Sequence, residues 1–188
     1  MRIKGEIMKV IHRAIIEKAR SLSPQPLTAL DIGCGNGAFT RLVSGSLPGT
    51  AVTAVDIDVS RVTDAGGIAF VKGSAENLPF SSEAFDVIIA AQTLHHWNDK
   101  QRGICEAYRV LKKGGSIIIG DPLLEDWLRS SFWGGLIQAV DRGSFTDRKR
   151  LTGYLEKAGF GDISISAVSG TMKSVYLITA SKGWATTD

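Results

Sequence analysis

The chain has 188 residues and a mass of 20.1 kDa, a size that predicts one domain with a substantial hydrophobic core. Apolar residues make up 44% and charged residues 22%, as in ordinary globular proteins, and a net charge of +3 is too small to indicate a nucleic-acid-binding face. No apolar run is long enough to span a membrane. The two cysteines, Cys34 and Cys105, favour free thiols in a reducing cytoplasm over a disulfide.

The first predicted helix covers residues 4–22, because apolar residues recur there at helical spacing opposite a basic face. This segment is amphipathic throughout and lacks the compact apolar block of a secretory signal. Ser23-Pro24-Gln25-Pro26 ends the helix. Its apolar stripe favours packing on the edge of a sheet.

A glycine turn joins the next two predicted elements, a buried strand over residues 29–34 and a helix over residues 38–46. Glycines at positions 33, 35 and 37 let the backbone bend sharply and approach a ligand closely. The helix behind the turn presents free N–H groups and the positive end of its dipole. Asp31 lies near the carboxyl end of the strand, where open α/β sheets bind their ligands.

A second predicted strand, residues 51–55, ends in Asp56, roughly 20 residues past the turn, where ribose-binding carboxylates are expected. Asp56 could instead cap a helix or lie solvated in a turn, but its pairing with the glycine turn favours a ligand-binding role. The turn itself reads G-x-G-x-G, one residue shorter than the G-x-G-x-x-G of dinucleotide-binding turns.

The segment Asp31–Gly37, followed by Val55–Asp58, resembles the first two motifs of the class I S-adenosylmethionine-dependent methyltransferases. Three later segments resemble that family's next motifs in the same order: Phe70–Phe80, Phe85–Ala90 and Glu106–Gly115. The resemblance covers about residues 27–120 and is strongest to the small-molecule branch that includes the ubiquinone and menaquinone methyltransferases. It implies an α/β fold: a doubly wound, mostly parallel seven-stranded sheet with a C-terminal antiparallel hairpin.

The resemblance also implies S-adenosylmethionine as methyl donor and S-adenosylhomocysteine as product. The glycine turn would hold the methionine end of the donor, with Asp31 orienting its amino-acid part, and Asp56 would take both ribose hydroxyls. Gln92 would lie near the sulfonium. The complete set of candidate donor-binding residues is Asp31, Gly33, Cys34, Gly35, Asn36, Gly37, Asp56, Ile57, Ser74, Ala75, Glu76 and Gln92.

Two departures from the family pattern affect the adenine side, which Ile57, Ala75 and Glu76 would line. The family commonly has an aspartate where Ser74 stands, and a serine hydroxyl forms a weaker hydrogen bond without charge assistance. A full helix usually follows the ribose-binding acid, whereas here residues 59–65 precede two glycines that break a helix. We therefore expect one short helical turn or an irregular segment, and a more open pocket.

A pair of histidines, His95 and His96, follows the fourth predicted strand, residues 86–91, beside the expected donor site. No further ligand at zinc-like spacing completes a metal site, so no metal is predicted. His96 is either a partly buried ring bonded to backbone or a group that contacts the methyl acceptor and takes its proton. It is the candidate catalytic residue, whereas Trp97 fits a core position better than a substrate platform.

The rest of the chain completes a single methyltransferase domain over residues 1–188. Further strands are expected over residues 68–72, 116–120, 163–168 and 174–180, and further helices over residues 100–111 and 147–158. The resemblance implies that residues 1–23 act as a lid and that a helical insertion over residues 121–146 covers the acceptor site. The aromatic residues of that insertion could instead fill a core or a homodimer contact.

Two other classes of function compete with methyl transfer to a small molecule. An NAD-type oxidoreductase is disfavoured by the short glycine turn and by the C-terminal hairpin. A non-catalytic protein that keeps the fold finds support in Ser74 and in the shortened segment after the second strand. The expected partner is a small-molecule acceptor rather than a nucleic acid, and the sequence leaves open both the acceptor and the atom methylated.

Overall fold

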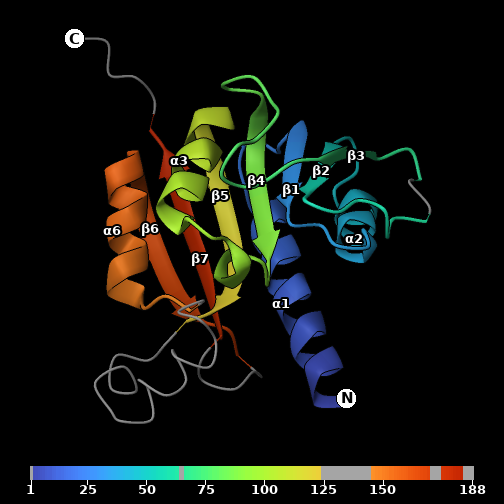
Figure 1. The fold of residues 1–188 in the computed structure, drawn as a ribbon, viewed down its shortest axis with the longest axis horizontal. Helices are drawn as coiled ribbons and strands as arrows, with labels where there is room; N and C mark the ends of the chain where they lie inside the picture. Colours follow the sequence, from blue (N-terminus) through green and yellow to red (C-terminus); the bar gives the residue numbers. More distant parts are fainter. Residues whose placement is uncertain (1, 64–65, 124–144, 170–174, 184–188) are drawn as a thin grey trace.

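The computed structural model describes residues 2–63, 66–123, 145–169 and 175–183. Within these residues, seven strands form one sheet in the order β3-β2-β1-β4-β5-β7-β6 (Figure 1). The strands are β1 (Thr28–Ile32), β2 (Ala51–Asp56), β3 (Ala69–Lys72), β4 (Phe85–Ala91), β5 (Leu111–Pro122), β6 (Phe160–Ala167) and β7 (Val175–Lys182). Strands β1 to β5 are parallel, and β7 pairs antiparallel with both β5 and β6. The expected fold class is thereby confirmed.

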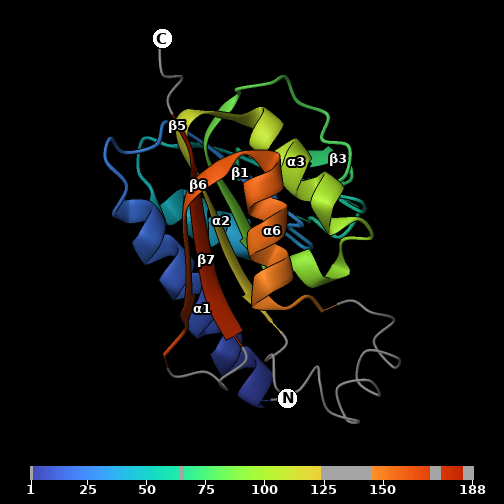
Figure 2. The same cartoon turned by 90° about the vertical axis from the view of Figure 1, so that its left-hand side faces the viewer.

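Helices cover both faces of the sheet. They are α1 (Arg2–Arg20), α2 (Ala38–Ser46), α3 (Lys100–Val110) and α6 (Arg148–Ala158), with a short 3₁₀ helix η1 (Leu94–His96) after β4. Side chains of α1 and α2 share one hydrophobic cluster, and those of α3 and α6 share the other. Figure 2 shows α1 on one side of the sheet and α3 and α6 on the other. The sheet is therefore the middle layer of three.

The central strands explain this layering. In β4, Ile88 and Ile89 point to opposite faces and are both fully buried, as expected for a parallel strand covered on both sides. Each such side chain contributes roughly 1.5–3 kcal/mol through its removal from water. The edge strand β6 instead alternates toward solvent. Because β1 to β5 are parallel, their carboxyl ends meet at one edge, and the loops that follow them gather there.

Helix α1 packs across a face of the sheet, over β4 and β5, so the expectation that it lies on a sheet edge was wrong. Its Ile11 and Ile15 side chains are fully buried. A Cβ atom on Gly120 of β5 would lie 2.5 Å from Ile11 Cγ2, so this glycine lets the helix approach the strand. The helix is therefore part of the core along most of its described length.

The connection between β2 and β3 and the start of β5 both depart from the regular pattern of the fold. Between β2 and β3, residues 57–63 and 66–68 contain no helix, as predicted. Strand β5 begins five residues earlier than expected, at Leu111, because a bulge in its pairing with β4 accommodates the lysines and glycines that follow α3. Within that bulge Lys112 Nζ pairs with Asp86 Oδ1 at 2.9 Å. Most of the predicted insertion, residues 124–144, and the turn between β6 and β7 lie outside the described residues.

Candidate active site

The glycine turn after β1 requires glycine for two reasons. Gly33, Gly35 and Gly37 have φ angles of 81°, 56° and 76°, a left-handed conformation that other residues rarely adopt. A Cβ atom on Gly33 would also lie 2.0 Å from Thr93 Oγ1, on the loop after β4. The absence of side chains therefore brings the turn against that loop, and Gly33 N donates a hydrogen bond to Val55 O of β2 at 2.8 Å.

The carboxylate of Asp56 lies at the carboxyl end of β2 and faces the turn. Its Oδ2 accepts a hydrogen bond from Gly35 N at 2.8 Å, and its Oδ1 accepts one from Asp58 N at 3.0 Å. No helix begins after it in residues 57–63 or 66–68, so a helix-capping role does not account for this side chain. Asp56 is instead a fixed, half-buried carboxylate on the wall of a pocket.

This first pocket has a volume of about 390 Å³ and lies between the loops that follow β1 to β4. Ser74, Ala75 and Glu76 of the loop after β3 are part of its lining. Glu76 Oε1 accepts a hydrogen bond from Asn98 N at 2.8 Å, and Ser74 Oγ donates to Glu76 Oε2. Burial raises the pKa of Glu76, but these hydrogen bonds outweigh it and lower the pKa overall. Glu76 thus ties two loops together and closes the pocket.

A second pocket, about 560 Å³, lies on the other side of the turn, between it and α1. Asp31 lines it, is 1% exposed, and accepts a hydrogen bond from Thr40 Oγ1 at 2.6 Å. Burial raises the pKa of Asp31 to about 7, Thr40 opposes the shift, and the charge of Asp56 adds to it. From α1, His12 stacks on Phe39 with ring centroids 4.3 Å apart, and burial lowers the pKa of this histidine.

The two pockets adjoin, because four residues line both: Gly33, Gly35, Arg61 and Gln92. Gln92 has a φ angle of 54° although it is not glycine, a conformation that costs on the order of 1 kcal/mol. Its backbone N–H donates a 2.7 Å hydrogen bond to Gly120 O of β5, which holds it in place. Such strain persists where the surrounding structure requires a residue at one position. Here it places Gln92 at the junction of the two pockets.

The paired histidines after β4 differ in their surroundings. His95 Nδ1 lies 2.9 Å from Oδ1 of Asp121, at the end of β5, and Leu94 N donates to Oδ2 of the same carboxylate at 3.0 Å. Burial raises the pKa of Asp121, which is 1% exposed, while the hydrogen bond and charge of His95 oppose that shift. His96 is exposed and lines the first pocket. Asp121 therefore orients His95, not His96.

Residues 30–119 match the methyltransferase domain family, which places the family's region over β1 to β5 and both pockets. The chain is similar to this family over 90 of its 188 residues. A 2-methyl-6-phytyl-1,4-hydroquinone methyltransferase of rice is 30% identical over 76% of this chain and 43% of its own length. A malonyl-[acyl-carrier protein] O-methyltransferase of Methylococcus capsulatus is 28% identical over 86% of this chain and 62% of its own.

Solved structures show the same fold. A [4+2]-cyclase superposes with a TM-score of 0.75 over 93% of this chain and 80% of its own, at 19% identity. The chain spans less than half the length of the first curated relatives that it matches. None of the described helices is long and apolar enough to cross a membrane. Among the described residues, no group of three or more histidine, cysteine or acidic side chains could hold a metal ion.

The fold gathers nearly all of the candidate residues at these pockets. The first pocket is lined by Gly33, Gly35, Asp56, Ile57, Ser74, Ala75, Glu76, Gln92 and His96. The second adds Asp31, Cys34 and Asn36. Gly37 lines neither pocket; it precedes α2, and a Cβ atom there would lie 2.8 Å from the ring of Phe70. Their individual roles toward a ligand stay predictions.

Sequence reasoning missed several residues of the site. Arg61 follows Asp56 by five positions, but no motif singles it out. Met8 and His12 line the second pocket from α1, so this helix belongs to both the core and the pocket wall. Asp121 was placed at the start of the predicted insertion, residues 121–146, whereas β5 continues to Pro122, and a carboxylate at its carboxyl end can reach the loop after β4.

Proposed function

We propose that this chain transfers the methyl group of S-adenosylmethionine to a small-molecule acceptor. The observation that carries the proposal is the pair of adjoining pockets at the glycine turn, with Asp56 on the wall of one and Asp31 on the wall of the other. A long ligand would fit the two pockets if its sugar lay beside Asp56 and its amino-acid group beside Asp31. The match to the methyltransferase domain family over residues 30–119 supports the same ligand.

The residues of the first pocket would bind the adenosine part. Asp56 would accept hydrogen bonds from the ribose hydroxyls, because a carboxylate has about four acceptor positions and protein donors account for two of them here. Ala75 and Ile57 would contact the faces of the adenine ring. Ser74 would be a weak partner for the adenine amino group, because its hydroxyl already donates to Glu76.

The residues of the second pocket would bind the methionine part. Asp31 would pair with the ammonium group, and this pairing would stabilise its ionised form. The backbone of the glycine turn would approach the ligand without intervening side chains. Gln92, at the junction of the pockets, would lie beside the reacting sulfur.

The chemistry of transfer requires little covalent participation by the protein. S-adenosylmethionine supplies a methyl group that is already activated by the positive charge on sulfur. The chain's contribution would be to hold donor and acceptor in line and to exclude water, effects that could supply most of the rate. Helix α1 and Gln92 would exclude water from the methionine end.

Removal of a proton from the acceptor would fall to His96, the candidate catalytic residue. His96 lines the first pocket, whereas His95 lines neither pocket and lies against Asp121. We therefore propose that His96 contacts the acceptor and takes its proton.

The names of the relatives suggest small, oxygen-bearing acceptors: one acts on a phytyl hydroquinone and another on a malonyl group held by a carrier protein. We propose a small-molecule acceptor of this general class and no nucleic-acid partner, which the net charge of +3 supports. The free cysteines Cys34 and Cys105 support action in the cytoplasm. Light scattering would test whether the chain forms the homodimer that we also include.

A ligand panel tests the proposed function. We expect S-adenosylmethionine and S-adenosylhomocysteine to raise the Tm of the protein and NAD to leave it unchanged, because ligands that bind only the folded state stabilise it. Transfer of a labelled methyl group to a panel of hydroquinones and phenols should then identify an acceptor. Stabilisation by NAD alone would contradict the proposal, and donor binding without transfer to any acceptor would favour the non-catalytic alternative.

A further inference from the structure

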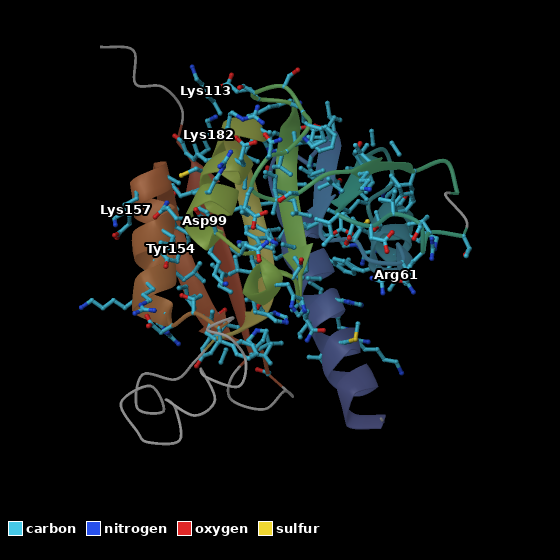
Figure 3. All side chains as sticks on the ribbon, in the orientation of Figure 1. Arg61, Asp99, Lys113, Tyr154, Lys157 and Lys182 are labelled. Carbon is cyan, nitrogen blue, oxygen red and sulfur yellow. The ribbon has the colours of Figure 1, made fainter. Side chains whose placement is uncertain are left out.

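A third pocket, about 330 Å³, opens on an exposed face of α6. It is lined by Asp147, Lys149, Arg150, Gly153, Tyr154 and Lys157. None of these residues lines the two pockets of the candidate active site. Figure 3 shows Tyr154 and Lys157 on α6, on the other side of the molecule from Arg61. The third pocket is therefore separate from the site proposed for the methyl donor.

The three cations of this pocket are poorly neutralised. Lys149 and Lys157 are exposed and form no hydrogen bond or ion pair within the described residues. Arg150 Nε lies 3.7 Å from Asp147 Oδ2, while Asp147 Oδ1 accepts a 2.8 Å hydrogen bond from Arg150 N and so caps the helix. Glu156, the only acidic residue of α6, is not in the lining. With three cations and one carboxylate, the lining carries a net charge of +2.

Gly153 stands in the middle of this lining, at a position where packing does not require a glycine. A Cβ atom there would meet nothing within 4 Å, and a glycine inside a helix is less favourable than an alanine. Lys149 precedes it by four positions and Lys157 follows it by four, so the three residues share one line of the helix surface. Gly153 therefore leaves a notch between two ammonium groups, with Arg150 and Tyr154 along the adjacent line.

We propose that this notch binds a phosphate monoester, with the phosphate group over Gly153 and its oxygens held by the three cations. A phosphate monoester carries nearly two negative charges above neutral pH and has three terminal oxygens, which matches the charge and the cations of the lining. The guanidinium of Arg150 can hold two oxygens at once, and each lysine adds a point charge. A phosphodiester has one charge and two free oxygens, so it would leave a cation unmatched. This inference goes beyond the proposed function and does not depend on it.

An NMR titration of the whole chain with glycerol 3-phosphate at about pH 8, where the ester is a dianion, tests the assignment. We expect the amide signals of Gly153 and its neighbours in α6 to shift, and the affinity to be about tenfold higher than that for dimethyl phosphate, a monoanion. Shifts centred on the glycine turn after β1 would place the phosphate elsewhere. Equal affinity for the two ligands would mean that this face attracts any anion. Either result overturns the inference.

Gly153→Ala separates binding from folding, because its two expected effects have opposite directions. Alanine favours the helix, so the Tm without ligand should rise by about 2–4 °C, while the added methyl group fills the notch and should weaken binding about fivefold or more. Gly45→Ala is the matched control, since this glycine of α2 also has nothing within 4 Å of its Cβ position but lies outside all three pockets. It should raise the Tm and leave the affinity unchanged. Unchanged affinity in Gly153→Ala would overturn the inference.

A charge variant and two kinds of vesicle complete the test. Lys157→Gln should weaken glycerol 3-phosphate about threefold to tenfold, whereas Lys113→Gln, exposed and outside the pocket, should not. Sedimentation of the protein with vesicles of phosphatidic acid, a monoester, but not of phosphatidylglycerol, a diester, would assign the site to a lipid headgroup. Binding of the soluble ester without sedimentation would assign it to a soluble phosphate ester. Binding in neither assay would overturn the inference and leave the proposed function intact.

Discussion

Gly35 N donates a 2.8 Å hydrogen bond to Asp56 Oδ2, and this bond connects the end of β2 to the glycine turn after β1. The other oxygen of the carboxylate accepts from Asp58 N. The side chain is therefore held in its position before any ligand arrives, which reduces the ordering cost of binding. A substitution at Asp56 should consequently have two effects, a lost ligand contact and a loosened turn.

Asp56→Ala should weaken the binding of S-adenosylhomocysteine by on the order of 2–3 kcal/mol, because it removes a charged acceptor of the ribose hydroxyls. Asp56→Asn should lose less, since its amide oxygen can still accept from Gly35 N. Calorimetry measures both affinities, and Asp58→Ala serves as control because this exposed carboxylate lines neither pocket. Wild-type affinity in the alanine variant would remove Asp56 from the site.

Much of the fold follows from local signals in the sequence. The glycine turn, the alternation of short apolar runs with amphipathic segments and the terminal pair of strands predict the sheet, and the predicted bounds of α2, residues 38–46, match. The start of β5 and the position of α1 depend instead on contacts between residues that are far apart in the sequence. Strand β5 starts at Leu111 because it pairs with Phe85 across a bulge, and α1 reaches a sheet face because Gly120 leaves room for Ile11.

The residues of the site likewise divide into those that local sequence signals predict and those that only the folded structure brings together. Asp31, the glycines and Asp56 are predictable because a strand, a turn and a second strand in succession bring them to one edge of a parallel sheet. His95 and Asp121 are 26 positions apart and meet only because β4 and β5 end side by side. Arg61 stands in an irregular segment, where no periodicity indicates the direction of a side chain.

Gly33→Ala should destabilise the protein more than Gly49→Ala does. Both glycines have left-handed φ angles, 81° and 84°, so each substitution costs about 1–2 kcal/mol of backbone strain. Only at Gly33 would the new Cβ atom also meet Thr93 Oγ1, at 2.0 Å, whereas nothing lies within 4 Å at Gly49. This crowding should add about 1–3 kcal/mol. Urea unfolding measures both losses, and equal values would show that the loop after β4 moves aside freely.

His95→Ala should lower the free energy of unfolding, and more so at about pH 8 than at about pH 5. Asp121 has a raised pKa in the folded state, so its contribution to stability is complete at low pH and is lost as the pH rises through that value. Removing His95 takes away a partner that opposes the rise in the pKa of Asp121. The stability that the variant loses should therefore increase with pH. His96→Ala is the control, because Asp121 pairs with His95 instead. A pH-independent difference would mean that the pair acts only through packing.

Asp31 should make stability depend on pH between about 4 and about 7. Its pKa is about 7 in the folded state against 3.8 ordinarily, so the folded protein binds a proton in this range that the unfolded chain does not. The stabilisation is complete below 3.8 and is lost as the pH rises through about 7. In the unaltered protein this loss of unfolding free energy amounts to up to roughly 4 kcal/mol. Asp31→Asn should not show it, although its amide oxygen can still accept a hydrogen bond from Thr40 Oγ1. Parallel pH profiles of the two proteins would contradict the assignment.

The same carboxyl group should report on ligand binding. At about pH 6 Asp31 is mostly protonated in the free protein, and an ammonium group placed beside it would favour the carboxylate. Binding of S-adenosylhomocysteine should therefore release close to one proton, which calorimetry in two buffers of different ionisation enthalpy measures directly. Asp31→Asn should bind without that release, and 5′-methylthioadenosine should release none from either protein because it carries no ammonium. Proton release with both ligands would place the titrating group at the adenosine end of the site.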